Sequence, residues 1–288
     1  GALDIGMVSS TVDLALESGC ASFDTASIYG LGKSEERLGV CLARDQFDCE
    51  IISKCGLSAT VVEAGKRAVV RKDSQRDALF RSLEASLCRL QQEQIQVYLL
   101  HWWDEITPIE DIVDTFMEMV RSKKIQTFGF SNLPIDQVNK VIELSPQKMY
   151  FQYPFSLAQQ EAAETLQFVH AHGHLTMAYG VLSQGLLTGK FSRKSTFDSD
   201  DRRHRLDHFK GKYRNDLDDK IDRMRDVVSL HGVTCTHASI AWACRKDFID
   251  RVIVGCKNPT QYRENYAAAS ESQMKNDLFF GTRGNFLK

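Results

Sequence analysis

The sequence lacks the features that mark membrane, secreted and nucleic-acid-binding proteins. No stretch of the 288 residues approaches the roughly 20 consecutive apolar residues of a membrane-spanning helix. The N-terminus has no basic segment followed by an apolar core, so no signal peptide is expected. Neither charge sign is in excess, because 36 Lys and Arg residues face 38 Asp and Glu residues. We therefore expect a cytoplasmic protein with no nucleic-acid and no membrane partner.

Paired cysteines and glycine-rich phosphate loops are missing as well. The eight cysteines are scattered and none forms a CxxC pair, which is typical of reduced thiols rather than of a disulfide framework. No His, Cys and Asp residues have the spacing of metal ligands, so no metal is expected. No GxGxxG occurs, which argues against an open doubly wound sheet that binds a dinucleotide.

What the sequence does contain is an alternation of short apolar runs and amphipathic segments. Seven runs have the character of strands: Ser22–Asp24, Ile51–Lys54, Ile95–His101, Ile125–Phe130, Met149–Gln152, His174–Ala178 and Arg251–Val254. Helical spacing separates them, beginning with a helix at about Val8–Ser18. This order predicts a parallel sheet with right-handed crossovers, and we favour a (β/α)8 barrel over the open sheet. The first strand of such a barrel would lie upstream of Gly1 or form a stub near Ala2–Leu3.

Domain organisation follows from the same pattern. At about 150 residues per domain the length suggests two domains, but α/β barrels often exceed 200 residues as one. No linker or repeat interrupts the chain, so residues 1–288 are expected to form a single domain. The polar segment Phe191–Asn215 breaks the alternation, and a lid, a binding loop or a solvated excursion would each explain it.

Several helices carry start signals. Ser74 and Asp77 have the spacing of a capping box before the helix Ala78–Arg89. Thr107 and Pro108 predict an N-cap followed by a proline at the first helical position. Pro134 opens Ile135–Leu144 similarly. One face of the Ala78–Arg89 helix carries a stripe of leucines that should pack on the sheet, namely Leu79, Leu83, Leu87 and Leu90.

Titratable side chains stand where three predicted strands end. Asp24, Lys54 and His101 end the first three strands, and Tyr29 follows Asp24 by five residues. Since the carboxyl ends of barrel strands build the active site, these four should meet there. A nearby ammonium lowers the pKa of a phenol, which would make Tyr29 a general acid for a forming oxyanion. Each residue taken alone also has a purely structural explanation. Asp24 or Lys54 would belong to a surface ion pair, Tyr29 would be a turn residue, and His101 would be a buried ring.

These residues belong to longer motifs that resemble the aldo-keto reductase family over about residues 8–270. The matching motifs are Phe23-Asp24-Thr25-Ala26-x-x-Tyr29-Gly30, Gly32-Lys33-Ser34-Glu35, Leu38-Gly39, Ile52-Ser53-Lys54, Leu99-Leu100-His101-Trp102, Gly129-Phe130-Ser131-Asn132, Leu186-Leu187-Thr188-Gly189-Lys190 and Ile253-Val254-Gly255-Cys256-Lys257. The bacterial and plant aldose-type branch is the most similar. The resemblance implies a (β/α)8 barrel and a nicotinamide-dependent reductase with Tyr29 as acid. It also implies that Asp24 and Lys54 tune this acid and that His101 orients the carbonyl.

The resemblance further implies where NADP(H) and the substrate bind. Ser131, Asn132 and Gln152 match the positions that hold the nicotinamide carboxamide, and Tyr179 matches the stacking aromatic residue. Further cofactor positions are Gly180, Leu182, Gly185, Leu187, Gly189, Lys190, Gly255, Lys257, Gln261, Glu264 and Asn265. Lys257 beside a helix N-terminus could pair with a 2′-phosphate, which favours NADPH over NADH. Ile28, Trp102 and Trp103 would line an apolar pocket for a small carbonyl or sugar substrate.

Other interpretations stay open. A cofactor-binding regulatory or channel-associated subunit would keep the same motifs with little turnover, and the absent first strand would suit a pseudoenzyme. Trp103 departs from the family, in which Pro often follows His-Trp, and the tail Gln273–Lys288 matches nothing in it. Neither the oligomeric state, the substrate nor the direction of reaction follows from the sequence.

Overall fold

Parallel strands form the framework of the chain. The computed structural model describes residues 4–271 except 21, 44–48, 62–67, 193, 199, 200, 207, 208 and 210. Its main sheet has seven strands in the order β1-β2-β5-β6-β7-β8-β9. Their bounds are β1 Ser22–Asp24, β2 Glu50–Cys55, β5 Ile95–Leu100, β6 Ile125–Ser131, β7 Tyr150–Pro154, β8 Leu175–Tyr179 and β9 Arg251–Val252. These are the seven strands predicted from the sequence, and the α/β TIM-type fold is confirmed. The proposed stub at Ala2–Leu3 lies outside the described residues.

The chain divides into two compact units. The first comprises Gly1–Gln152, Phe168–Thr176 and Lys257–Pro259, and the second comprises Tyr153–Gln167, Met177–Cys256 and Thr260–Lys288. Helices follow the strands in sequence: α1 Ile5–Glu17, α2 Lys33–Leu42, α3 Arg76–Leu90, α4 Ile109–Arg121, α5 Ile135–Leu144, α6 Ala163–Ala171, α7 Gly211–Leu230, α8 Cys235–Cys244 and α9 Pro259–Glu271. Every helix within the described residues is too short or too polar to cross a membrane.

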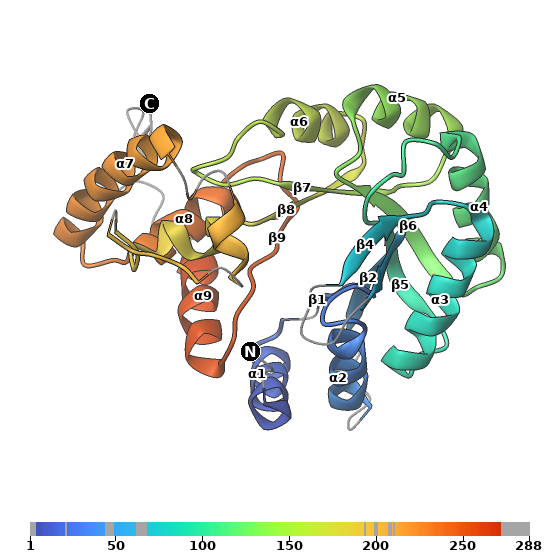
Figure 1. Ribbon diagram of the computed structural model, residues 1–288, viewed down its shortest axis with the longest axis horizontal. Coiled ribbons are helices and arrows are strands. Elements are labelled where there is room, and N and C mark those ends of the chain that lie inside the picture. Colours follow the sequence, from blue (N-terminus) through green and yellow to red (C-terminus); the bar gives the residue numbers. More distant parts are fainter. Residues whose placement is uncertain are drawn as a thin grey trace. The chain divides into compact units, whose positions relative to one another are not determined.

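In the first unit, helices α3 and α4 pack against the outer face of the sheet (Figure 1). The predicted leucine stripe of α3 is buried, with Leu79, Leu83 and Leu90 at 0% exposure. Each fully buried side chain of this kind contributes about 1.5–3 kcal/mol. Beside them, Phe116 of α4 stacks on Phe128 of β6 with ring centroids 5.1 Å apart. This core fixes the strands whose carboxyl ends carry the polar residues described below.

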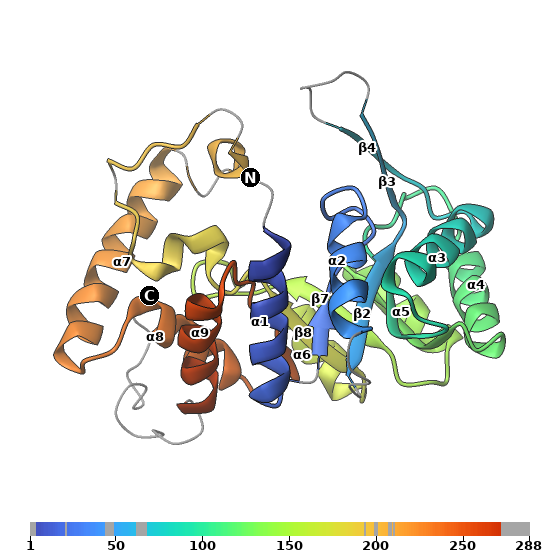
Figure 2. The same cartoon turned by 90° about the horizontal axis from the view of Figure 1, so that it is seen from below.

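A two-stranded hairpin that the sequence analysis missed follows β2. Strands β3 Leu57–Thr60 and β4 Val69–Lys72 pair antiparallel, with Leu57 opposite Lys72. The hairpin projects away from the helices of its unit (Figure 2). Both strands are short and β4 is exposed throughout, so they lack the apolar run that reveals a buried strand.

Two predicted helix caps are wrong. Helix α3 has Gln75 at its N-cap without a side-chain hydrogen bond, and α4 has Pro108 there, also without one. The reason is that Ser74 and Thr107 bind Asp104 instead: Asp104 N–H donates to Ser74 Oγ (3.2 Å), and Thr107 Oγ1 donates to Asp104 Oδ2 (2.7 Å). Pro134 likewise stands at the N-cap of α5 rather than at its first helical position, although the helix begins at Ile135 as expected.

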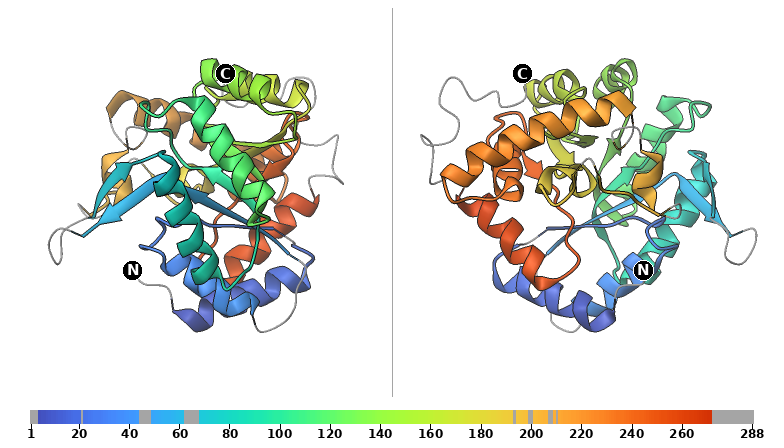
Figure 3. Two further views of the ribbon diagram at one scale, coloured as in Figure 1. Left: turned by 90° about the vertical axis from the view of Figure 1, so that its right-hand side faces the viewer. Right: turned by 60° about the vertical axis from the view of Figure 1, so that its left-hand side comes forward.

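In the second unit, the long helix α7 follows the polar segment (Figure 3). The predicted loop Phe191–Asn215 is shorter than expected, because α7 already begins at Gly211. The loop contains the short 3-10 helix η2 Arg202–Arg205. In it, the Arg203 guanidinium lies 4.3 Å from the Phe197 ring centroid and is bound by Asp201. The loop therefore packs on its own aromatic residues, which a purely solvated excursion would not do.

His174, just before β8, couples folding to pH. Its Nδ1 accepts a hydrogen bond from the Met149 N–H at 3.3 Å, and burial, helped by His172 and Lys148, lowers its pKa. Because the folded pKa lies below the ordinary value, this stabilisation is complete above that value and is lost as the pH falls through the folded pKa. We expect His174→Asn, which keeps an acceptor but does not titrate, to lose less stability than wild type between pH 7 and pH 5.

The measurement is the urea midpoint of both proteins at the two pH values. The difference should stay below about 1 kcal/mol, since solvent screens part of the charge. An equal loss in both proteins would show that His174 is not the titrating group.

Candidate active site

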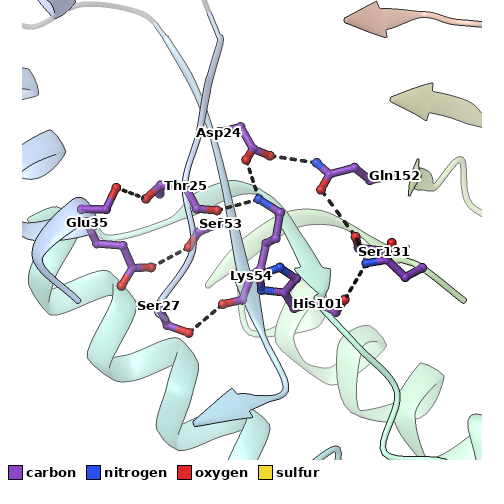
Figure 4. A network of polar contacts seen from close by, with 11 residues as sticks. Asp24, Thr25, Ser27, Glu35, Ser53, Lys54, His101, Ser131 and Gln152 are labelled. Atoms are coloured by element: carbon purple, nitrogen blue, oxygen red, sulfur yellow. Dashed lines mark hydrogen bonds and ion pairs between the residues drawn. The ribbon is translucent and has the colours of Figure 1, made fainter. Parts of the chain in front are cut away.

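The carboxyl ends of β1, β2 and β5 bring the predicted residues together (Figure 4). Lys54 is fully buried, and its Nζ lies 2.5 Å from Asp24 Oδ1 and 2.8 Å from the carbonyl oxygen of Thr25. His101 follows the end of β5, where its N–H donates to the carbonyl oxygen of Cys55 at 2.9 Å. The ion pair and the imidazole therefore share one edge of the sheet, as the strand order predicts.

Opposing influences act on the charge of Lys54. Burial lowers the pKa of Lys54, because an ammonium loses hydration in the interior. The charge and the hydrogen bond of Asp24 act in the opposite direction, and Glu35 adds a smaller effect of the same sign. Asp24 is thus the main group that keeps a buried lysine charged at this position.

Tyr29 lies beside both Lys54 and His101. Its ring centroid is 5.4 Å from Lys54 Nζ and 5.7 Å from the imidazole centroid, with the two rings at 84°. Tyr29 is 41% exposed, so an external molecule can reach it. The four predicted catalytic residues form one cluster that pairs a reachable phenol with a buried ammonium and an imidazole.

Next to this cluster, amide and hydroxyl groups form a chain across β6 and β7. Gln152 Nε2 donates to Asp24 Oδ2 (2.8 Å), and Ser131 Oγ donates to Gln152 Oε1 (3.5 Å). Asn132 Nδ2 donates to Ser131 Oγ (2.9 Å) and to the His101 carbonyl oxygen (3.2 Å). A carboxamide needs both donors and acceptors, and Ser131, Asn132 and Gln152 offer both. The donor set therefore fits the nicotinamide carboxamide.

A second buried charge behind Lys54 was not singled out from the sequence. Glu35 of α2 has 0% exposure; Ser53 Oγ donates to its Oε1 (2.5 Å) and Arg89 Nε of α3 to its Oε2 (2.7 Å). Ser53 and Lys54 are neighbours on β2, and Figure 4 shows that Ser53 binds Glu35 whereas Lys54 binds Asp24. Glu35 was visible in the sequence as the acidic residue of the Gly32–Glu35 motif, but its partner Arg89, which is partly exposed, is distant in sequence.

The predicted substrate residues occupy the loops around this edge. Trp102 is 40% exposed, and Ile28 is partly buried. Trp103 is held by the loop itself, because its Nε1 donates to the carbonyl oxygen of Thr107 at 2.8 Å. Asp104 organises the same loop by accepting from the N–H groups of Ile106 (3.0 Å) and Thr107 (2.9 Å). Burial tends to raise its pKa, but these hydrogen bonds prevail and lower it.

Most of the remaining predicted cofactor residues belong to the second unit. Tyr179 ends β8, and its carbonyl oxygen accepts from Phe155 N–H at 3.0 Å. Gly180 and Leu182 lead into the 3-10 helix η1 Ser183–Thr188, which contains Gly185 and the buried Leu187. Gly189 and Lys190 follow it. Gly255 and Lys257 lie between β9 and α9, and helix α9 carries Gln261, Glu264 and Asn265. Over the residues that the structure describes, no three His, Cys, Asp or Glu side chains are grouped as a metal site requires.

The sequence and the fold are similar to those of known proteins. A sequence model described as the Aldo/keto reductase family matches residues 6–279. Aldo-keto reductase YhdN of Bacillus subtilis (strain 168) is 30% identical over 261 residues, covering 87% of this chain and 75% of the relative. The NADH-specific methylglyoxal reductase of Escherichia coli (strain K12) is 25% identical over 93% of this chain and 84% of its own length. Among solved structures, a glycerol dehydrogenase from Gluconobacter oxydans aligns with a TM-score of 0.84 and 26% identity over 99% of this chain and 88% of that one.

Proposed function

Because the chain belongs to the aldo/keto reductase family, we propose that it is an NADPH-dependent reductase of aldehydes and ketones with Tyr29 as general acid. At the coarser level the chain is an oxidoreductase that acts on carbonyl or alcohol groups with a nicotinamide cofactor. The observation that supports Tyr29 is its place between Lys54 and His101, at 5.4 Å and 5.7 Å from its ring.

The cofactor supplies a hydride to the carbonyl carbon. The chain's own residues handle the proton that the carbonyl oxygen then needs. Tyr29 donates this proton, because the Lys54 ammonium stabilises the phenolate that remains. Asp24 holds Lys54 charged, and His101 orients the carbonyl oxygen. In the reverse direction Tyr29 would accept the proton of an alcohol or lactol.

Three parts of the cofactor are assigned to residues of this chain. Ser131, Asn132 and Gln152 hold the carboxamide, as their donors and acceptors fit it. Lys257, next to the start of α9, pairs with the 2′-phosphate that distinguishes NADPH from NADH. Tyr179 would stack on the nicotinamide ring, as the family resemblance implies. A relative that is NADH-specific makes the nucleotide preference a property to be measured.

The test follows nucleotide oxidation at 340 nm (roughly the absorbance maximum of reduced nicotinamides) with wild type and a panel of small aldehydes. We expect turnover with NADPH in excess of that with NADH. In Lys257→Met the KM for NADPH should rise about tenfold with little change for NADH, since one charge-assisted contact of about 1.5 kcal/mol or more is lost. Equal KM changes for both nucleotides would contradict the 2′-phosphate assignment.

A folded protein that binds either nucleotide without turning over any aldehyde would instead support a regulatory subunit. The panel includes neutral aromatic, aliphatic and sugar aldehydes, because Ile28, Trp102 and Trp103 give the mouth of the site an apolar character. A substrate preference within the panel would name the physiological class.

A further inference from the structure

Lys72 of the β3–β4 hairpin forms a charged pair with Glu105 of the loop after β5, next to Trp102. Lys72, the last residue of β4, places its Nζ 5.5 Å from the ring centroid of Trp102. The same Nζ lies 2.9 Å from Glu105 Oε1. Lys72 thus contacts the residue that directly follows His101, the residue that is proposed to orient the substrate carbonyl.

The hairpin is anchored where the pair forms. At its base, Asp73 N–H donates to the carbonyl oxygen of Gly56 at 3.0 Å, directly after β2. Ser74 N–H then donates to Asp104 Oδ2 at 2.9 Å, which ties the hairpin to the loop that carries Trp102 and Glu105. These two N–H donors hold the base of the hairpin against the loop, which keeps the backbone of Lys72 within reach of Trp102 and Glu105.

Gly56 makes this close approach possible. Its φ of 83° is left-handed, and an added Cβ would stand 2.7 Å from Leu100 Cδ1 and 3.3 Å from the Trp102 carbonyl oxygen. The turn from β2 into the hairpin therefore passes directly against the end of β5 and the start of the Trp102 loop.

We propose that Lys72 and Glu105 are specificity-determining residues of the carbonyl site. They set the net charge of the Trp102 wall, by which we mean the side of the site formed by Trp102, Lys72 and Glu105. In wild type the carboxylate of Glu105 balances the ammonium of Lys72, so the wall accepts neutral aromatic and aliphatic groups and offers no net attraction to a carboxylate. The inference rests on the proposed function, because it describes the substrate side of that site. Neutralising one partner should unbalance the wall in a predictable direction.

The two single substitutions have opposite expected effects. Glu105→Gln leaves the ammonium uncompensated, so preference for a carboxylate-bearing substrate over its neutral analogue should rise about threefold to tenfold. Lys72→Met leaves the carboxylate uncompensated, so the same preference should fall by a similar factor. Added salt should reduce both changes in preference, since the side chains of Glu105 and Lys72 are 69% and 39% exposed.

The experiment compares 4-carboxybenzaldehyde with benzaldehyde by their kcat/KM values, with saturating nicotinamide nucleotide. Arg71→Gln is the matched control, because Arg71 precedes Lys72 on β4 and strand alternation turns it to the opposite face. The inference is supported if the preference for 4-carboxybenzaldehyde over benzaldehyde is highest in Glu105→Gln, intermediate in wild type and lowest in Lys72→Met. Arg71→Gln should then equal wild type. An unchanged order, or an equal shift in Arg71→Gln, would overturn the inference.

A binding measurement separates this inference from the proposed function. Benzamide and 4-carboxybenzamide carry the same groups but are not reduced, and their dissociation constants are read from tryptophan fluorescence of the nucleotide-bound protein. If the amide affinities follow the expected order while no aldehyde turns over, the reductase proposal alone fails. If the ratio of the two amide affinities is the same in every variant, the inference about Lys72 and Glu105 is wrong whatever the turnover.

Discussion

Tyr29→Phe is expected to lower kcat for aldehyde reduction by about 10²–10⁴-fold, the range that a general acid typically contributes. The substitution removes only the hydroxyl. The ring that lies 5.4 Å from Lys54 Nζ and 5.7 Å from the His101 centroid is retained, so the neighbours should keep their places. Because Tyr29 is 41% exposed, stability should change little. The measurement is single-turnover reduction with saturating NADPH, together with the thermal midpoint.

Tyr98→Phe provides the matched control. Tyr98 of β5 has 0% exposure, and its hydroxyl donates to Ser82 Oγ at 3.3 Å. Burial raises its pKa well above the ordinary value, so this phenol stays protonated and takes no part in proton transfer. We expect Tyr98→Phe to cost about 1 kcal/mol of stability with kcat unchanged. If Tyr29→Phe kept more than a tenth of the wild-type kcat, another group would have to supply the proton.

The placement of the catalytic cluster could be predicted because it depends on topology. Once strands and helices alternate, parallel pairing places every strand's carboxyl end on the same edge. Asp24, Lys54 and His101 end three strands that are neighbours in the sheet, so their proximity follows without any knowledge of side-chain packing. The leucine stripe of α3 was predictable for a similar reason, since helical period alone determines one buried face.

Features that depend on partners distant in sequence could not be predicted. Glu35 is buried with Arg89, which stands 54 positions later, and no local pattern links the two. Ser74 has the spacing of a helix cap, but it forms hydrogen bonds with Asp104 of the loop after β5 instead. The β3–β4 hairpin is solvated along β4, so it lacks the hydrophobic period that identifies a strand.

The close approach of β6 and β7 at Gly129 is another feature that depends on a partner distant in sequence. Gly129 lies opposite Tyr150, and two residues further along the same strands Ser131 lies opposite Gln152. Gly129 was visible in the sequence only as part of a family motif. Its physical reason is that an added Cβ would stand 1.9 Å from the carbonyl oxygen of Tyr150, a distance no real contact allows.

Gly129→Ala is therefore expected to destabilise the fold by about 3 kcal/mol or more, because the clash is with backbone that cannot rotate away. The substituted protein can fold only if β6 and β7 move apart at this point. That movement would also separate Ser131 from Gln152 and so break the chain that reaches Asp24. Urea unfolding of the nucleotide-free protein measures the loss, and nucleotide binding to whatever folded protein remains should weaken in parallel.

Gly255→Ala is the control for the stability measurement, since no atom lies within 4 Å of the Cβ it would add. It should leave the unfolding midpoint near that of wild type, because the unfolded chain loses freedom on gaining a Cβ and the folded chain meets no clash. A Gly129→Ala protein as stable as the Gly255→Ala protein would mean that β6 and β7 can separate without cost. The Ser131–Gln152 contact would then be a loose consequence of strand pairing rather than one enforced by it.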